Sequence, residues 1–490
     1  MKVSFSNTAK YEGAVAVPVF LDNRHSKGAD ALDEATGGTI SRAQKGSRFH
    51  GKDGQTIVIN APSGIAAQTV FLGGVGDRDA VGVLDWEAFG ARALKSVQCS
   101  GAKTLVFDMR DLDAPASARA VFGAQLAAYR FDKYRTTLKD DKKPSITAVR
   151  VICSDSAAAK SAYAPLKETA EGVILARDLV SEPANVLHPE SFAKKAQDLE
   201  EYGLEVQILD EKDMKKLGMN ALLSVGQGSN YGSKLAVMSW FGAKDRKEAP
   251  LVLVGKGVCF DTGGISLKPG AGMWDMKGDM GGAAAVTGTM RALAGRKARA
   301  NVIGIIGLVE NMPDAAATRP GDIITSADGQ TIEVQNTDAE GRLVLVDALW
   351  YGLRFKPKQI IDFATLTGAI IIALGHENAG VFSNDDALAG ALDSAGKASG
   401  ETVWRLPIGA GYDKLIDSKY ADMKNIGGRG AGSITAAQFL HRYVGDTPWA
   451  HVDIAGTAWK DSSDDPREPV WATGYGVRLM DNFVSEQCEG

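Results

Sequence analysis

The feature of this sequence that most restricts its fold is a series of short apolar runs that alternate with helix-like segments. In the second half of the chain, Leu251–Val254 and Asn301–Leu308 are nearly uninterrupted apolar stretches. Such strands are typical of sheets that are covered on both faces, and those sheets are mostly parallel. Residues at helical spacing follow, as in Gly281–Leu293 and Leu343–Leu353. The pattern predicts an α/β fold with a central, mostly parallel sheet flanked by helices.

The same alternation divides the chain into two parts. In the first part, strands are predicted at Ala14–Leu21, Thr56–Ile59, Thr69–Leu72, Thr104–Phe107 and Ile146–Ile152, and helices at Trp86–Gln98 and Ala116–Phe131. In the second part, further strands are predicted at Glu205–Leu209, Ala236–Trp240, Gln359–Phe363 and His451–Ile454. An alanine-rich stretch between the parts predicts one long helix. We therefore expect an N-terminal mixed-sheet α/β domain at 1–155, a connecting helix at 156–181 and a second α/β domain at 182–490.

The composition is that of an ordinary globular protein. The 490 residues are 44% hydrophobic and 23% charged, which is enough for two or three domains with sizeable cores. The net charge of -5 gives no overall attraction to nucleic acid or to an anionic membrane. The four cysteines form no Cys-x-x-Cys pair, which argues against a disulfide framework or a thiolate zinc cluster. Because no signal peptide core or membrane-length apolar run is present, we expect a cytoplasmic protein without a membrane partner.

One short stretch, NTDAEGRL at 336–343, places two carboxylates and a guanidinium between a strand-like run and a helix-like run. In open α/β sheets, ligands bind where strand ends face helix starts, and a helix N-terminus favours anionic groups. Asp338 and Glu340 are two residues apart, so both side chains can point to the same side of an extended loop. Taken alone, the stretch is also compatible with a solvated Asx-type turn.

Two upstream segments add charged residues at predicted strand ends. Lys256 and Asp261 lie in a glycine-rich segment after the strand Leu251–Val254, and Lys268 follows shortly afterwards. Asp279 comes directly before a helix of small residues, where the simpler interpretation is a helix N-cap.

If these strand ends converge, Asp261, Asp279, Asp338 and Glu340 share one pocket. Such a cluster strongly disfavours full ionisation without cations. Two divalent metal ions would neutralise the cluster, and a two-metal site can hold a hydroxide and polarise the group that it attacks. The predicted ligands are rich in oxygen and include no His-x-x-x-His pair. Manganese or magnesium therefore suits them as well as zinc.

These residues resemble the leucyl aminopeptidase family, the M17 cytosol aminopeptidases of the bacterial aminopeptidase A type. The family signature NTDAEGRL stands intact at 336–343. Further family blocks occur in the same order: GKGVCFDTGG at 255–264, SLKP at 266–269, MKGDMGGA at 276–283, ATLTGA at 364–369, ADMKN at 421–425 and WAHVDIAG at 449–456. The resemblance is dense from about residue 170 onward and weak before it. It implies a catalytic metallopeptidase domain at 182–490.

The resemblance implies a ligand set for two metal ions. One ion would be held by Asp261, Glu340 and Asp338, the last also through its backbone carbonyl. The second ion would be held by Lys256, Asp261, Asp279 and Glu340. Lys256 would bind as a neutral amine, because two adjacent cations lower its pKa.

The same resemblance assigns roles to two catalytic cations. Lys268 would stay charged and stabilise the oxyanion of the scissile carbonyl. Arg342 matches the family arginine that holds a bicarbonate ion, which would act as the general base. The motifs supply no histidine or spare glutamate in its place.

The resemblance also implies exopeptidase selectivity. A free α-amine can bind a metal ion directly, so only the first peptide bond lies over the hydroxide. Met276, Thr365, Gly368 and Ala455 match the positions that line the family's pocket for the first side chain. Met276 and Ala455 make the pocket apolar, which implies a preference for leucine, although ordinary core packing is the simpler interpretation for Met and Ala.

The implied function is a metal-dependent aminopeptidase with two manganese or zinc ions per subunit, assembled as a homohexamer that acts on small peptides. Some bacterial relatives also bind DNA in recombination or transcription, so a DNA-binding protein with an incidental peptidase site is one alternative, which the net charge does not favour. A two-metal phosphoesterase is another, because it uses the same metal chemistry.

Overall fold

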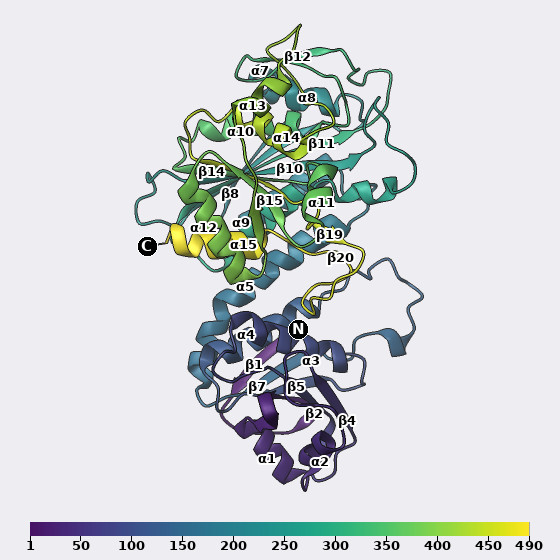
Figure 1. Cartoon of the computed structure of the whole chain (residues 1–490), viewed down its shortest axis with the longest axis vertical. Coiled ribbons are helices and arrows are strands. Elements are labelled where there is room, and N and C mark those ends of the chain that lie inside the picture. Colours follow the sequence, from purple (N-terminus) through teal and green to yellow (C-terminus); the bar gives the residue numbers. More distant parts are fainter. Residues whose placement is uncertain (490) are drawn as a thin grey trace. The chain divides into compact units, whose positions relative to one another are not determined.

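The protein is described here by a computed structural model that covers residues 1–489. These residues form two compact units, each with its own large sheet (Figure 1). The first unit consists of Met1–Ala170 and Ser463–Pro469, and the second of Glu171–Ser462 and the residues from Val470 onward. Within residues 1–489, no helix combines the length and apolar character that crossing a membrane requires.

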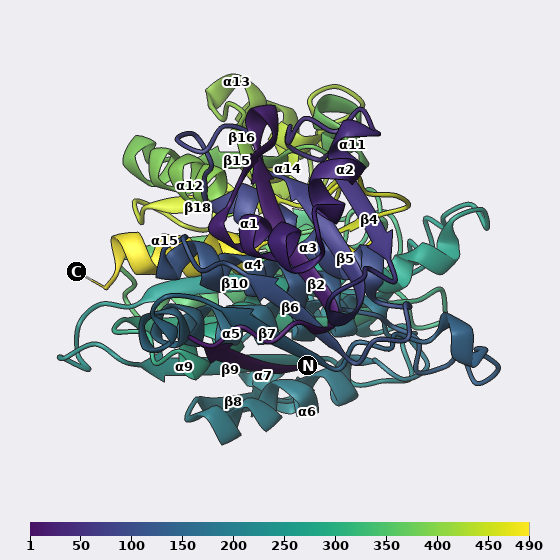
Figure 2. The same ribbon diagram turned by 90° about the horizontal axis from the view of Figure 1, so that it is seen from below.

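The first unit contains a seven-stranded mixed sheet (Figure 2). In spatial order its strands are β1 (Lys2–Ser6), β7 (Ala148–Ile152), β6 (Thr104–Asp108), β2 (Glu12–Phe20), β5 (Ala66–Gly74) and β4 (Thr56–Asn60), with β3 (Arg24–His25) beside β2. All neighbours are parallel except β4 with β5 and β3 with β2.

Helices cover both faces of this sheet because successive strand residues alternate between two cores. Phe71 packs in the core that contains α3 (Val83–Val97) and α4 (Ala114–Ala127), whereas Leu72 packs with α1 (Lys27–Ala35) and α2 (Thr39–Lys45). Alternation of this kind follows from the two-residue period of a strand.

The second unit contains an eight-stranded sheet. In spatial order its strands are β16 (Val403–Arg405), β15 (Ala379–Ser383), β18 (Trp449–Asp453), β14 (Gln359–Ala364), β10 (Leu251–Asp261), β11 (Asn301–Asn311), β9 (Lys234–Phe241) and β8 (Glu205–Leu209). The four central strands, from β18 to β11, run parallel to one another.

Two helices lie on opposite faces of this sheet. A Cβ atom added to Gly304 of β11 would touch Met290 of α9 (Gly281–Gly295). A Cβ atom added to Gly307 of the same strand would touch Val344 of α10 (Gly341–Leu353). The central strands are therefore buried on both faces, as their uninterrupted apolar runs predict.

The remaining elements complete the two units. The helices are α5 (Ser156–Ser181), α6 (Pro189–Gln197), α7 (Glu211–Lys216), α8 (Asn220–Gly226), α11 (Gly368–Leu374), α12 (Asp386–Ser399), α13 (Ala410–Asp413), α14 (Gly432–His441) and α15 (Val477–Gln487), and the 3-10 helices are η1 (Leu21–Asn23), η2 (Asp140–Lys142), η3 (Asp198–Tyr202), η4 (Met273–Gly278) and η5 (Lys414–Ile416). The short strands are β12 (Ile323–Thr325), β13 (Thr331–Glu333), β17 (Met423–Lys424), β19 (Trp459–Lys460) and β20 (Trp471–Ala472).

The predicted fold class is confirmed, and the predicted strand Glu205–Leu209 has the predicted bounds. The prediction that the strand starting at Leu251 stops at Val254 is wrong, because β10 continues to Asp261. Its glycines are signs of close packing rather than of a loop: a Cβ atom at Gly255 would lie 2.7 Å from the Cα of Ala283 in α9. The division of the chain at residues 155 and 181 stays a prediction.

Candidate active site

The predicted site residues come from four segments that meet beside the central strands of the second sheet. β10 carries Lys256 and Asp261, and the loop that follows it carries Lys268. Asp279 stands between η4 and α9. The fourth segment, 334–340, joins β13 to α10 and is called the ligand loop below, because it carries the predicted ligands Asp338 and Glu340.

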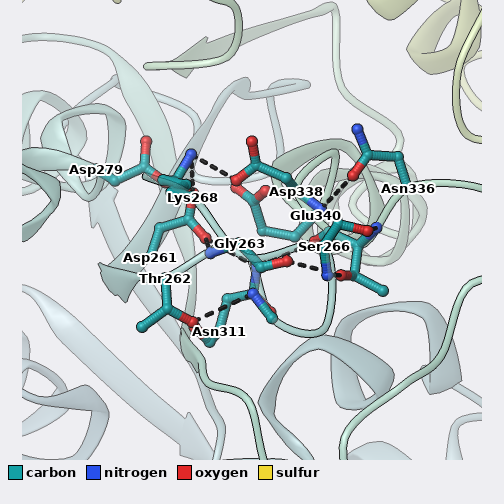
Figure 3. A network of polar contacts seen from close by, with 12 residues as sticks. Asp261, Thr262, Gly263, Ser266, Lys268, Asp279, Asn311, Asn336, Asp338 and Glu340 are labelled. Atoms are coloured by element: carbon teal, nitrogen blue, oxygen red, sulfur yellow. Dashed lines mark hydrogen bonds and ion pairs between the residues drawn. The ribbon is translucent and has the colours of Figure 1, made fainter. Parts of the chain in front are cut away.

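Three carboxylates converge closely enough to share one cation (Figure 3). Asp261, Asp338 and Glu340 each offer a ligand oxygen, and these atoms lie within 4.8 Å of one another. Asp261 and Glu340 are almost entirely buried, with exposed fractions of 2% and 3%. Buried carboxylates are costly unless they are paired with cations. The segments therefore form a site for positive charge.

Two lysine ammonium groups provide positive charge at this site. Lys256 Nζ lies 2.8 Å from Asp279 Oδ2 and 2.9 Å from Glu340 Oε1. Lys268 Nζ lies 2.8 Å from Asp261 Oδ2 and 2.5 Å from Asp338 Oδ1. Each lysine thus bridges two carboxylates, and the site holds four carboxylates around two ammonium groups.

The pKa values of these carboxyl groups reflect the shortage of positive charge. Burial, and next the Glu340 charge, raise the pKa of Asp261 to about 6. Burial also raises the pKa of Asp279 well above its usual value. Burial acts in the same direction on Glu340, but Lys256 and Lys268 hold its pKa below the usual value. Burial raises the pKa of Asp338 as well, so three of the four carboxyl groups resist ionisation.

The pKa values of the two lysines are raised, whereas a metal-bound amine requires a lowered pKa. Burial alone would lower the pKa of Lys256, but Asp279, Glu340 and Asp261 outweigh burial and raise it. The same balance, led by Asp261 and Glu340, raises the pKa of Lys268. The surrounding carboxylates therefore favour the ammonium form of Lys256, whose nitrogen would have to lose a proton to bind a metal ion.

The residues present fit divalent metal ions. Oxygen-rich donor sets suit hard divalent cations. In addition, Asp279 Oδ2 and Asp338 Oδ1 are buried and accept no hydrogen bond of acceptable geometry within residues 1–489, although a lysine lies within ion-pair distance of each. Buried polar atoms normally have such a partner. These oxygens are therefore available to a cation.

One known protein family matches most of the chain. The catalytic domain of the cytosol aminopeptidase family (M17) matches residues 174–480, and the N-terminal domain of the same family matches residues 16–138. The chain belongs to the cytosol aminopeptidase family. A probable cytosol aminopeptidase of Caulobacter vibrioides is 56% identical over 494 residues, covering 100% of both chains. Another, of Rhizobium etli, is 52% identical over 494 residues, covering 100% of this chain and 99% of the relative.

Solved structures at 32% identity share the fold. A mutant of tomato leucine aminopeptidase superposes with a TM-score of 0.87 at 32% identity, covering 99% of this chain and 97% of the other. The bottromycin maturation enzyme BotP in complex with Mn superposes with a TM-score of 0.85 at 32% identity, covering 98% and 99%. The predicted family is thus confirmed, and this aminopeptidase is a metal-dependent exopeptidase that acts at peptide N-termini.

In the aminopeptidase, Asp279 does not cap a helix. The residue that precedes α9 is Met280, so the N-cap interpretation is wrong. Asp279 Oδ1 instead accepts hydrogen bonds from Lys256 Nζ and from Thr365 Oγ1, both at 2.8 Å. The backbone carbonyl of Thr365 accepts a further bond from Lys256 Nζ at 2.8 Å. Thr365, predicted only to line the substrate pocket, therefore contacts two of the predicted ligands.

The other predicted pocket residues lie in three further segments. Gly368 begins α11, and a Cβ atom there would meet no heavy atom of residues 1–489 within 4 Å. Ala455 is buried, and its N–H donates to Asp453, which also accepts from Thr367. Met276 belongs to η4, where its carbonyl accepts from the N–H of Asp279.

Arg342 lies beside the carboxylate cluster but is not part of it. Its Nη1 donates to the carbonyl of Asn425 at 2.6 Å, and its Nε is buried without a hydrogen-bond partner within residues 1–489. Burial lowers the pKa of Arg342 to about 10, against the opposing charges of Glu340 and Asp453. The side chain remains charged at neutral pH and retains a free donor.

Sequence reasoning missed the neutral residues that support the ligands. Asn311 Nδ2 donates to Asp261 Oδ1 at 2.8 Å and to the carbonyl of Thr337 at 3.0 Å. Thr337 Oγ1 donates to the carbonyl of Gly263 at 2.6 Å and accepts from the N–H of Ser266 at 2.8 Å. Asn311 ends an apolar strand and belongs to no motif, so the sequence gives no signal for it.

Two buried residues near the site lie outside the ligand set. His451 is fully buried, and its Nδ1 lies 2.5 Å from Asp362 Oδ1 in the neighbouring strand. Cys259 is buried within β10, and burial raises the pKa of its thiol well above the usual value. Neither side chain is a candidate for the chemistry.

Proposed function

We propose that the protein is a two-metal aminopeptidase with a preference for leucine and other apolar N-terminal residues. The observation that carries this proposal is the convergence of four carboxylates, three buried and one partly exposed, around two lysines in a chain of this family. Two divalent ions bound there would activate a water molecule and polarise the scissile carbonyl.

The proposed ligands divide between two positions. Asp261, Asp338 and Glu340 would hold one ion, because their oxygens lie within 4.8 Å of one another. Lys256 and Asp279 would hold the second ion, together with Asp261 and Glu340. Asp279 Oδ2 is buried and lies 2.8 Å from Lys256 Nζ, but it accepts no hydrogen bond of acceptable geometry within residues 1–489, and this supports that assignment. Either manganese or zinc suits these donors.

Lys268 and Arg342 would act on the substrate rather than on the ions. Lys268 pairs with Asp261 and Asp338, and with these carboxylates bound to metal ions its ammonium group would be free to donate to the developing oxyanion. Arg342 has a buried Nε without a partner within residues 1–489, which suits an anionic group such as bicarbonate as the proton acceptor.

Substrate selection would depend on the segment around Thr365. Thr365 touches both Lys256 and Asp279, so a substrate amine at the second metal ion would place its first side chain near this residue. Gly368 leaves open space next to it, and Met276 and Ala455 would supply apolar walls. We further propose a cytoplasmic homohexamer that cleaves small peptides. A DNA-binding role gains no support from the net charge of -5.

Hydrolysis of leucine p-nitroanilide tests the proposal. Chelated wild-type protein should be inactive and should recover with manganese or zinc, whereas Asp338→Ala and Glu340→Ala should remain inactive. Activity that survives chelation and both substitutions would refute the metal mechanism. Hydrolysis of aryl phosphates without hydrolysis of the anilide would favour a phosphoesterase, and a salt-sensitive gel shift without hydrolysis would favour the DNA-binding alternative.

A further inference from the structure

Asn425 is a fully buried polar residue that directly follows β17. This strand pairs in parallel with β13, so that Glu333 lies opposite Lys424. The N–H of Asn425 continues the pairing by donating to the carbonyl of Glu333 at 3.1 Å. Its side chain is thereby held at the point where β13 ends and the ligand loop begins.

The carboxamide of Asn425 forms four hydrogen bonds to the backbone of residues 335–339. Its Oδ1 accepts from the N–H of Gln335 at 2.8 Å and from the N–H of Asn336 at 3.3 Å. Its Nδ2 donates to the carbonyl of Asn336 at 2.6 Å and to the carbonyl of Ala339 at 3.2 Å. One side chain therefore takes the place of a neighbouring strand along this segment.

These bonds lie on both sides of Asp338, one of the proposed metal ligands. Asp338 lies between Asn336 and Ala339, both of which Asn425 holds, and Glu340 follows directly. Thr337, within the ligand loop, fixes its opposite side by hydrogen bonds to Ser266 and Gly263. The two carboxylates are thus presented by a turn that is fixed from both sides.

Asn425 also contacts the predicted catalytic arginine. Its backbone carbonyl accepts from Arg342 Nη1 at 2.6 Å, and the buried Nε of that arginine has no hydrogen-bond partner within residues 1–489. The same residue therefore fixes the ligand loop and the orientation of the guanidinium at the start of α10.

We propose that Asn425 is a positioning residue for the metal site. It fixes the turn that presents Asp338 and Glu340 to the metal ions, and it orients Arg342 toward the substrate side. This inference rests on the proposed metal ligands. Residues that orient metal ligands change metal affinity or activity by about 10- to 100-fold when they are replaced.

Two substitutions separate the parts of this role. Asn425→Asp keeps the size and the acceptor oxygen but replaces the donor Nδ2 with an oxygen that faces two carbonyl groups. Asn425→Ala removes the carboxamide. Asn384 provides a matched control, because its carboxamide also joins two backbone groups, the carbonyl of Thr447 and the N–H of Trp449, and it belongs to none of the family blocks.

The test measures manganese affinity of the chelated full-length protein by electron paramagnetic resonance of free Mn²⁺, together with kcat and KM for leucine p-nitroanilide at saturating metal. We expect both Asn425 variants to bind manganese at least about tenfold more weakly. Their kcat should fall while KM changes little, because the proposed pocket residues are untouched. Asn384→Ala and Asn384→Asp should retain wild-type affinity and kcat.

Variants of Asn425 with wild-type manganese affinity and kcat would overturn this inference alone. If both variants lose their fold, as judged by circular dichroism, Asn425 is a general structural residue and the inference is also wrong. A wild-type chain that binds no manganese or zinc would instead overturn the proposed function, and this inference with it.

Discussion

The substitution Gly341→Ala tests whether the position of Lys256 governs the metal site. Gly341 begins α10 and does not have a positive φ, so alanine is acceptable to the backbone. Its Cβ atom, however, would lie 2.6 Å from Cε, 2.7 Å from Cδ and 2.8 Å from Nζ of Lys256. Lys256 would have to retreat by about 0.8 Å to reach the 3.4 Å of ordinary contact.

Moving Lys256 would mainly disturb its ion pairs in the metal site. The end of a lysine side chain is flexible, but Lys256 is buried and its Nζ is fixed at 2.8 Å from Asp279 and 2.9 Å from Glu340. Overpacking of this kind costs about 1–3 kcal/mol. The same loss in the transition state lowers kcat/KM by about 5- to 150-fold.

The assay is kcat/KM for leucine p-nitroanilide at saturating manganese, with thermal melting measured in parallel. Gly390→Ala in α12 is the matched control and should leave activity unchanged, because a Cβ atom there would meet no atom of residues 1–489 within 4 Å. Activity of Gly341→Ala within twofold of wild type would show that the reasoning about Lys256 is wrong.

Three further predictions concern the site and the core. Lys268→Met should lower kcat by about 10²- to 10³-fold with metal bound, because an oxyanion donor is lost; steady-state kinetics with metal analysis checks this, and unchanged kcat contradicts it. Burial raises the pKa of Asp347 to about 7, so the folded chain holds a proton that the unfolded chain releases above about pH 4. The free energy of unfolding should therefore fall by up to about 4 kcal/mol between pH 4 and 7. Denaturant unfolding of Asp347→Asn should show a smaller fall, and parallel pH curves would refute the assignment. Chelation should lower the melting temperature, because the carboxylates of Asp261 and Asp279 then rely on lysines alone; equal melting curves with and without manganese would count against the metal site.

The fold class was predictable from the sequence because the buried strands are long apolar runs. The bounds of β10 were not predictable. Glycines such as Gly255 and Gly257 are typical of loops, yet here they lie in a strand. Glycine is required at both positions because neighbouring backbone and α9 approach closely. Likewise, residues 463–469 belong to the first unit although they come late in the chain. The ion pair between Arg467 and Glu87 within that unit has no local sequence signal.

The candidate site was predictable where charged residues lie in dense motifs. Lys256 and Glu340 occur in such motifs, and the structure brings them within 2.9 Å of each other. The supporting amides were not predictable, because their roles depend on contacts between distant segments. Asn425 is nearly 90 residues from the backbone groups that it holds, and asparagine in a short polar segment is more typical of a turn.

The central claim is that each chain holds two catalytic metal ions, and the most direct test is a count of the bound ions. Equilibrium dialysis of chelated protein against Mn²⁺, with elemental analysis and parallel activity measurements, gives that number. We expect two ions per chain in the wild type, and one ion with little activity in Asp279→Ala. Full activity with one ion per chain, or with none, would contradict the account.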